Sequence, residues 1–176
     1  GRHICLREVR PAATWQAIRA HGVTHFNAAP TVLAMLAADE HAVPVDRPVT
    51  VATGGAPPSP TLIGRLEDLG ISVTHLYGLT ETYGPAAICD WRPEWSSQPA
   101  DARARLRARQ GVANVVGVPL RVVDHAGRDV AADGEERGEV LLRGNNVMLG
   151  YYRDPDATEA ASLHDDDGTW FRTGDI

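Results

Sequence analysis

The sequence predicts an α/β fold, in which part of a parallel sheet with flanking helices is followed by a β-rich subdomain that forms part of a barrel. Three observations predict this fold. Short apolar runs alternate with amphipathic helical stretches over roughly the first 80 residues. Proline and glycine stand where those helices are expected to begin and end. Beyond residue 119 the apolar residues follow the pattern of short strands joined by glycine-containing turns.

The first part of the chain consists of strand–helix repeats. Proline or a capping serine opens each expected helix, and glycine suits a left-handed stop at its end. The expected helices run from Pro11 to Gly22, from Pro30, and from Ser59-Pro60 to Gly70, between strands at 3–8, 23–28, 49–55 and 71–78. Because parallel strands need crossover connections, this alternation implies a parallel sheet covered by helices.

The pattern changes after residue 85. Trp91 and Trp95 are expected to pack under the connection that follows, and the arginines of a helix at 99–109 are expected to be solvated. Further on we expect antiparallel strands at 120–130 and 137–144, a helix capped by Asp154-Pro155, and a turn and strand at 167–175. The chain therefore divides into an α/β part (1–85), a connecting segment with a helix (86–118) and a β-rich part (119–176).

Composition narrows the class of protein. The 176 residues are 43% hydrophobic and carry a formal charge of −6, which argues against nucleic acid or an anionic membrane as the main partner. No apolar run approaches the roughly 20 residues of a membrane helix, and no secretory signal opens the chain. Cys5 and Cys89 are too far apart for a disulfide framework or a zinc site, and His75 is expected to be a satisfied core histidine. A cytoplasmic location is expected, and the oligomeric state stays open.

The termini predict that the chain is an excerpt from a longer protein. It begins without an initiator Met and stops at "FRTGDI", a strand-like segment with no element after it.

Two loops of the first part have residues suited to a nucleotide. Gly54 and Gly55 follow a strand directly, and glycine lets a ligand approach the backbone. Ligands of parallel sheets bind outside the carboxyl ends of strands, where Tyr77, Thr80 and Glu81 also fall. Tyr77 suits stacking on a purine, Thr80 a hydrogen bond to phosphate, and Glu81 a magnesium ion beside phosphates. The alternatives are a tight connection at the glycines, a core tyrosine and an ordinary helix start.

Asp175 is a third candidate. An acidic side chain after a strand can accept hydrogen bonds from both ribose hydroxyls, although "RTGD" also suits an ordinary turn.

Four stretches together resemble the adenylate-forming superfamily of acyl-CoA synthetases, peptide-synthetase adenylation domains and beetle luciferases. They are "GGAP" (54–57), "YGLTE" (77–81), "GEVLLRGNNVMLGYYRDPDATEAA" (138–161) and "WFRTGD" (170–175). Within the superfamily, the segments at 83–95, 107–111 and 143–152 look most like short- and medium-chain acyl-CoA synthetases. All three predicted parts would then belong to one larger AMP-binding domain.

The resemblance implies roles for particular residues. The turn at 54–57 would wall the adenine opposite Tyr77, Thr80 would contact the α-phosphate, Glu81 would hold Mg²⁺ and Asp175 would bind the ribose. The implied nucleotide-binding residues are Gly54, Gly55, Ala56, Pro57, Tyr77, Gly78, Thr80 and Asp175, with Thr80 and Glu81 catalytic; the implied acyl contacts are Asn27, Ala28, Gly55 and Gly84.

The implied function is that of an ATP-dependent acyl-CoA ligase, whose substrates are a carboxylic acid, ATP and CoA. The alternatives are an adenylation domain that loads a carrier protein and a non-catalytic nucleotide-binding module. The family's phosphate loop with its lysine is expected upstream, and the lysine of its mobile C-terminal domain beyond Ile176. We therefore expect residues 1–176 alone to be inactive.

Overall fold

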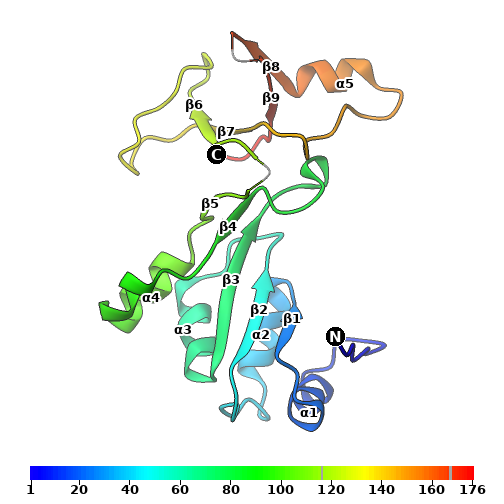
Figure 1. Ribbon diagram of the computed structural model, residues 1–176, viewed down its shortest axis with the longest axis vertical. Helices are drawn as coiled ribbons and strands as arrows, with labels where there is room; N and C mark the ends of the chain where they lie inside the picture. The colour runs from blue at the N-terminus through cyan, green and yellow to red at the C-terminus, as the bar shows by residue number, and fades with distance from the viewer. Residues whose placement is uncertain (116, 167) are drawn as a thin grey trace. The chain divides into compact units, whose positions relative to one another are not determined.

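The computed structural model describes residues 1–115, 117–166 and 168–176, which form two compact units. The first unit comprises 1–77 and 88–111, and the second comprises 78–87 and 112–176. Chain segments of the two units thus alternate along the sequence (Figure 1). The three-part division made from the sequence stays a prediction.

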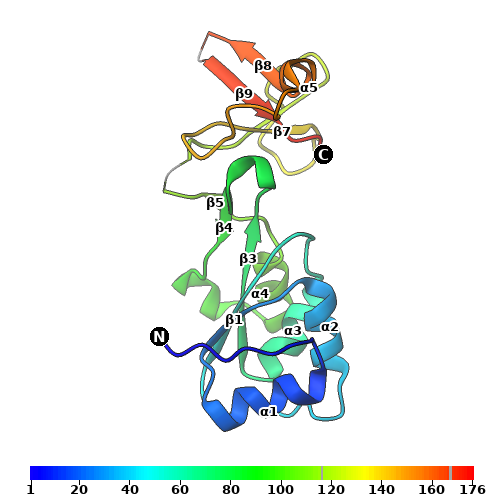
Figure 2. The ribbon, with the colours of Figure 1, turned by 90° about the vertical axis from the view of Figure 1, so that its right-hand side faces the viewer.

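The first unit is a helix-covered sheet. Its elements are α1 (Pro11–His21), β1 (His25–Asn27), α2 (Pro30–Ala38), β2 (Val49–Thr53), α3 (Pro60–Asp68), β3 (Ile71–Tyr77), a 3₁₀ helix η2 (Pro93–Ser97) and α4 (Ala100–Arg107), with β4 (Ala87–Cys89) beginning at its boundary. Strands β1, β2 and β3 are neighbours and pair in parallel. Helix α3 packs beside α2 and α4, and Figure 2 shows all three helices beside the strands. The predicted parallel sheet with flanking helices is confirmed.

Local signals set the helix ends as predicted. Gly22 ends α1 in the left-handed conformation at φ 60°, and the hydroxyl of Ser59 accepts a hydrogen bond of 3.2 Å from the amide of Leu62 at the start of α3. Alternate side chains of β2 and β3 point to the same side of the sheet, and the helices bury one face against them. The fully buried side chains of this core include Trp15, Leu33, Leu36, Ile63, Leu66, Val49, Val51 and Ile71.

The strand predicted at residues 3–8 is wrong. These residues are not in a strand, and all of them except Ile4 are exposed. An apolar run becomes a strand only when its backbone groups have a neighbouring strand to bond.

The arginines of the predicted helix at 99–109, which the structure has as α4 (Ala100–Arg107), differ from one another. Arg105 and Arg109 are exposed as expected, but the prediction is wrong for Arg107, which is 7% exposed. Its guanidinium pairs with Glu67 of α3 at 2.8 Å and lies 4.5 Å above the ring of Trp91. Trp91 in turn meets Trp95 edge to face, with ring centroids 5.7 Å apart. Arg107 therefore joins the connecting segment to the core.

His75 on β3 is buried, as predicted, and its Nδ1 lies 2.9 Å from the carbonyl oxygen of Arg109.

The second unit is built around an antiparallel sheet. Its elements are a 3₁₀ helix η1 (Thr80–Thr82), β5 (Val112–Ala113), β6 (Arg121–Val123), β7 (Glu139–Leu142), α5 (Pro155–Ala160), β8 (Ser162–Asp165) and β9 (Gly168–Arg172). The four strands of the sheet lie in the order β6-β7-β9-β8 and pair antiparallel. Among the described residues this sheet is open and does not close into a barrel, so the β-rich part is confirmed as a sheet. Asp167, at the start of the predicted final turn, lies outside the described residues.

The core of this sheet contains Val123, Leu141 and Trp170. The guanidinium groups of Arg121 and Arg143 lie 4.9 and 4.6 Å from the Trp170 ring, so both cations rest on an apolar surface.

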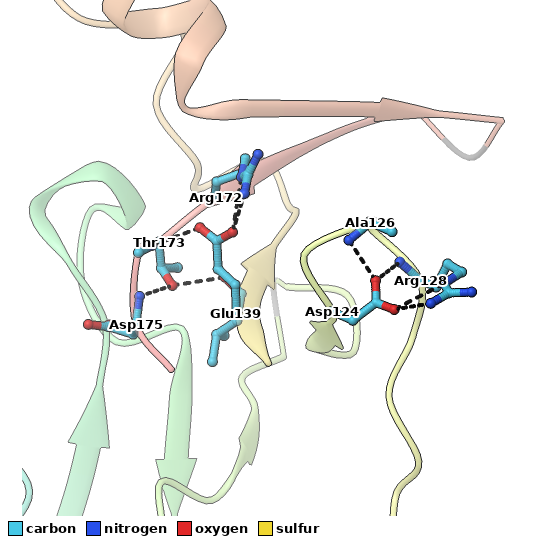
Figure 3. Close-up of polar contacts among 9 residues, drawn as sticks. Asp124, Ala126, Arg128, Glu139, Arg172, Thr173 and Asp175 are labelled. Atoms are coloured by element: carbon cyan, nitrogen blue, oxygen red, sulfur yellow. Dashed lines mark hydrogen bonds and ion pairs between the residues drawn. The ribbon is translucent and has the colours of Figure 1, made fainter. Parts of the chain in front are cut away.

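A tight turn follows β6. The carboxylate of Asp124 accepts hydrogen bonds from the amides of Ala126 and Arg128 and from the Arg128 side chain (Figure 3). These bonds, led by the Arg128 amide, lower the pKa of Asp124 to about 2. Further along, Asp154 caps α5 as predicted, since its Oδ1 accepts from the amide of Ala157 at 2.9 Å.

No helix within the described ranges is long and apolar enough to cross a membrane.

Candidate functional site

The carboxyl ends of three parallel strands meet at one edge of the first unit. β1 ends at Asn27, β2 at Thr53 and β3 at Tyr77, and Asn27 pairs with Ala52 and Thr53 with His75. The residues that follow, Ala28 and Gly54, therefore lie at the same edge as Tyr77. This is the position where open parallel sheets bind ligands.

The turn after β2 depends on its first glycine. A Cβ on Gly54 would lie 2.8 Å from the carbonyl oxygen of Leu76, closer than a side chain can sit. Gly55 has a φ of +83° and open space where its Cβ would be, and Ala56 and Pro57 are exposed. The turn thus presents accessible backbone beside the strand that carries the half-buried Tyr77.

The loop at 78–84 is closed by contacts between its own residues. A Cβ on Gly78 would lie 2.3 Å from the carbonyl oxygen of Gly84, so the two ends of the loop pack directly on each other. Between them, the buried hydroxyl of Thr82 accepts from the amide of Leu79 at 3.0 Å and donates to the carbonyl of Gly84 at 2.8 Å. This leaves Thr80 exposed at the start of η1.

A second segment, 146–151, holds this loop from outside. The side-chain amide of Asn146 donates to the carbonyl of Thr82 at 3.0 Å, and the amide of Met148 donates to the carbonyl of Glu81 at 2.7 Å. The phenol of Tyr151 donates to Oε1 of Glu81 at 3.0 Å. The hydrogen bond to this carboxylate raises the pKa of Tyr151. Both the backbone and the side chain of Glu81 are therefore fixed by segment 146–151.

Asp175 lies in a turn that Glu139 stabilises (Figure 3). The carboxylate of Glu139 accepts from the guanidinium of Arg172 at 2.6 and 3.0 Å and from the amide of Gly174 at 3.0 Å. The bonds from Arg172 hold the pKa of Glu139 below its ordinary value. Thr173 completes the turn, because its hydroxyl accepts from the amide of Asp175 at 3.1 Å.

The predicted residues thus fall into two groups, one in each unit. The first unit carries Asn27, Ala28, Gly54, Gly55, Ala56, Pro57 and Tyr77; the second carries Gly78, Thr80, Glu81 and Gly84 in one loop and Asp175 after β9. The meeting of the two groups around one nucleotide stays a prediction.

Three residues of these sites were not singled out from the sequence. Tyr151, Asn146 and Glu139 all lie in the stretch 138–161, which served only to establish a resemblance. Tyr151 contacts a residue 70 positions away, and no local pattern signals such a contact.

The carboxylate of Glu81 suits a magnesium ion that is bound beside phosphates. The described part of the chain holds no group of three or more His, Cys, Asp or Glu that could hold a metal. Mg²⁺ beside substrate phosphates needs only one or two carboxylates, with water and phosphate oxygens as the other ligands. Glu81 offers one such carboxylate, and no described residue donates a hydrogen bond to its Oε2.

Comparison with known proteins identifies the family. The sequence model of the family described as "AMP-binding enzyme" matches residues 1–152. The chain belongs to the AMP-binding enzyme family.

Curated relatives of this AMP-binding protein are similar over its whole length. It is 45% identical to "Probable acyl-activating enzyme 5, peroxisomal" of Arabidopsis thaliana and 45% identical to "2-methylpropanoate–CoA ligase CCL4" of Humulus lupulus. All of this chain is covered in both comparisons, but only 31% of each relative. The chain thus spans about a third of the length of these relatives.

Solved structures show the same fold. ATP-bound MatB from Rhodopseudomonas palustris superposes with a TM-score of 0.77 over 98% of this chain and 31% of that one, at 23% identity. The N-terminal domain of FACL13 from Mycobacterium tuberculosis superposes with a TM-score of 0.72 over 95% of this chain and 39% of that one, at 26% identity.

Proposed function

We propose that these residues form the central part of an ATP-dependent acyl-CoA ligase. In the first step a carboxylate of the acid attacks the α-phosphorus of ATP, the bond to the β-phosphate breaks, and pyrophosphate leaves. In the second step the thiol of CoA attacks the acyl carbon and AMP leaves. The observation that carries the proposal is the turn at Gly54, pressed against Leu76 at the carboxyl edge, which exposes backbone beside Tyr77.

The adenosine would be held by the turn at 54–57, Tyr77 and Asp175. The exposed backbone of 54–57 would lie against one face of the adenine and the ring of Tyr77 against the other, because every base offers a face for stacking. Asp175 would accept hydrogen bonds from the ribose hydroxyls, and the backbone of Gly78 would lie beside the nucleotide. Glu139 supports this role, because it fixes the turn in which Asp175 lies.

Thr80 and Glu81 would act at the phosphates. The exposed hydroxyl of Thr80 would donate to an α-phosphate oxygen, and Oε2 of Glu81 would bind Mg²⁺. The bound ion would neutralise charge on the phosphates as pyrophosphate leaves. The protein would thus contribute mainly positioning and charge stabilisation.

The acid would lie near Asn27, Ala28, Gly55 and Gly84. Because relatives are named as 2-methylpropanoate–CoA and acetate–CoA ligases, we propose a short-chain acid as substrate.

We keep the cytoplasm as the proposed location, although one relative is named peroxisomal.

The full chain that contains residues 1–176 is the material for the test. Pyrophosphate release should require ATP, Mg²⁺ and an acid such as acetate or 2-methylpropanoate, and CoA should convert the adenylate to a thioester. Pyrophosphate release that is independent of every acid tried would contradict a ligase. Product transfer to a carrier protein and none to CoA would contradict the proposed acceptor.

The ribose assignment has its own test. Calorimetry with AMP should show saturable binding that Asp175→Ala weakens at least tenfold, because hydrogen bonds to a charged group each contribute about 1.5–3 kcal/mol. Asp156→Ala, an exposed carboxylate in the first turn of α5, is the matched control. Equal affinities of the Asp175 variant and the wild type would refute the assignment.

A further inference from the structure

We propose that Tyr151 is a positioning residue that biases Glu81 toward binding a metal through one oxygen and so favours Mg²⁺ over Ca²⁺. The inference rests on the proposed function, in which Glu81 binds the ion that accompanies ATP. It adds a role for a residue of the stretch at 138–161 that faces the loop of Thr80 and Glu81.

The first step is the contact itself. The Tyr151 hydroxyl lies 3.0 Å from Oε1 of Glu81 and occupies a lone pair of that oxygen. The amide of Met148 donates to the carbonyl of Glu81 at 2.7 Å, so the glutamate side chain starts from a fixed backbone position. Oε2 is then the oxygen that remains for a cation.

The second step is the anchoring of Tyr151. Its amide donates to the hydroxyl of Thr158 in α5 at 2.9 Å, and this hydroxyl donates to the carbonyl of Asp154 at 2.7 Å. A Cβ on Gly150 would lie 2.9 Å from the Thr158 side chain, so the segment before Tyr151 packs directly on α5. The phenol therefore approaches Glu81 from a fixed backbone.

The third step is the chemistry of the two cations. Mg²⁺ is small, requires nearly octahedral geometry and binds carboxylates through single oxygens beside water and phosphate. Ca²⁺ is larger, takes six to eight oxygens and often binds a carboxylate through both of them. A hydrogen bond to Oε1 thus weakens this oxygen as a ligand and disfavours the binding through both oxygens that Ca²⁺ often uses, whereas Mg²⁺ binding through Oε2 alone is unaffected.

The test compares Tyr151→Phe with Tyr152→Phe in the full chain. Tyr152 is the neighbouring tyrosine, is 85% exposed and keeps its ring against Arg153 in the variant. Calorimetry gives the dissociation constants of the Mg²⁺ and Ca²⁺ complexes of ATP, and thus their ratio. Tyr151→Phe should lower the preference for Mg²⁺ by about three- to tenfold, the effect expected for one partly exposed hydrogen bond to a carboxylate. Tyr152→Phe should leave the preference unchanged.

A second pair of variants tests the anchoring without touching the phenol. Thr158→Val removes the hydroxyl that holds the Tyr151 amide, and Thr158→Ser keeps it. Valine should shift the preference in the same direction as Tyr151→Phe, by a smaller factor, and serine should retain it. If Tyr151→Phe does not fold, the two Thr158 variants still test the positioning role of Tyr151.

The outcomes separate the two proposals. If wild-type binding of ATP depends on a divalent cation but Tyr151→Phe and Thr158→Val keep the wild-type preference, the positioning role is refuted and the proposed function stands. An equal shift in Tyr152→Phe refutes it too. If the wild type binds ATP equally well with and without a divalent cation, the metal assignment of Glu81 fails, and the positioning role fails with it.

Discussion

Replacing Glu139 with glutamine is expected to loosen the turn that carries Asp175. The wild-type carboxylate accepts two hydrogen bonds from Arg172 and one from the amide of Gly174. Glutamine keeps one oxygen for the Gly174 amide, but it turns a donor toward the guanidinium and removes the negative charge. The ion pair and the charge assistance are therefore both lost.

The expected loss of stability in Glu139→Gln depends on how exposed the side chains of Glu139 and Arg172 are. The side chain of Glu139 is 17% exposed, whereas that of Arg172 is 43% exposed, so solvent screens the ion pair to about 0.5–1 kcal/mol. Loss of charge assistance at the Gly174 amide adds about 0.5 kcal/mol. The sum of about 1–1.5 kcal/mol corresponds to roughly a five- to tenfold rise in local opening.

Amide hydrogen exchange in the full chain measures this opening directly. The amide of Val140, which donates to the carbonyl of Asp175 at 2.9 Å, and the amides of 173–176 should exchange faster in Glu139→Gln. Arg172→Met, which leaves the bond from Gly174 intact, should have roughly a two- to fivefold effect. Exchange within twofold of wild type in Glu139→Gln, with a larger effect in Arg172→Met, would refute the reasoning.

The same contact predicts a pH dependence. Because folding lowers the pKa of Glu139 from its ordinary value of 4.5, the carboxylate stabilises the fold fully above that pH. The contribution is lost as the pH falls through the lower folded value. The difference in melting temperature between wild type and Glu139→Gln should persist from pH 7 to about pH 5 and shrink below pH 4.5.

Three further changes test other parts of the structure. Arg107→Ala removes the buried partner of Glu67 and should cost about 3 kcal/mol in urea unfolding, whereas Arg107→Met combined with Glu67→Leu should recover most of that loss. Gly54→Ala places a Cβ 2.8 Å from the carbonyl of Leu76, so calorimetry should show AMP binding weakened about tenfold or more, and wild-type affinity would contradict the site. Asp154→Ala removes the cap of α5 and should cost about 1 kcal/mol, seen as faster amide exchange in that helix, while Asp154→Ser should stay near wild type.

Local signals in the sequence were enough to predict the parallel layer. Proline and Ser59 open helices, and Gly22 ends one, through interactions within a few residues. The apolar spacing between these signals sets which face of each element is buried. The glycine turn at Gly54 and the strand end at Tyr77 could be placed at one edge, because parallel strands share the direction of their carboxyl ends.

Contacts between distant segments required the tertiary structure. Residues 3–8 have the composition of a strand, but strand formation depends on a partner that the local sequence does not supply. Arg107 looks like its exposed neighbours in α4, and only the packing of α3 beside it brings Glu67 within 2.8 Å. The same holds for Tyr151 and Glu81, whose contact joins positions 70 residues apart.

The sequence by itself thus determined the order of the helices and strands from α1 to β3, the family and the residues suited to a nucleotide, because residue type and short spacing carry that information. The tertiary structure decided which side chains fix those residues, such as Glu139 beneath the turn of Asp175 and Tyr151 against Glu81. The physical reason is that a hydrogen bond between distant residues depends on how whole elements pack. The residues next to either partner in the sequence do not specify that packing.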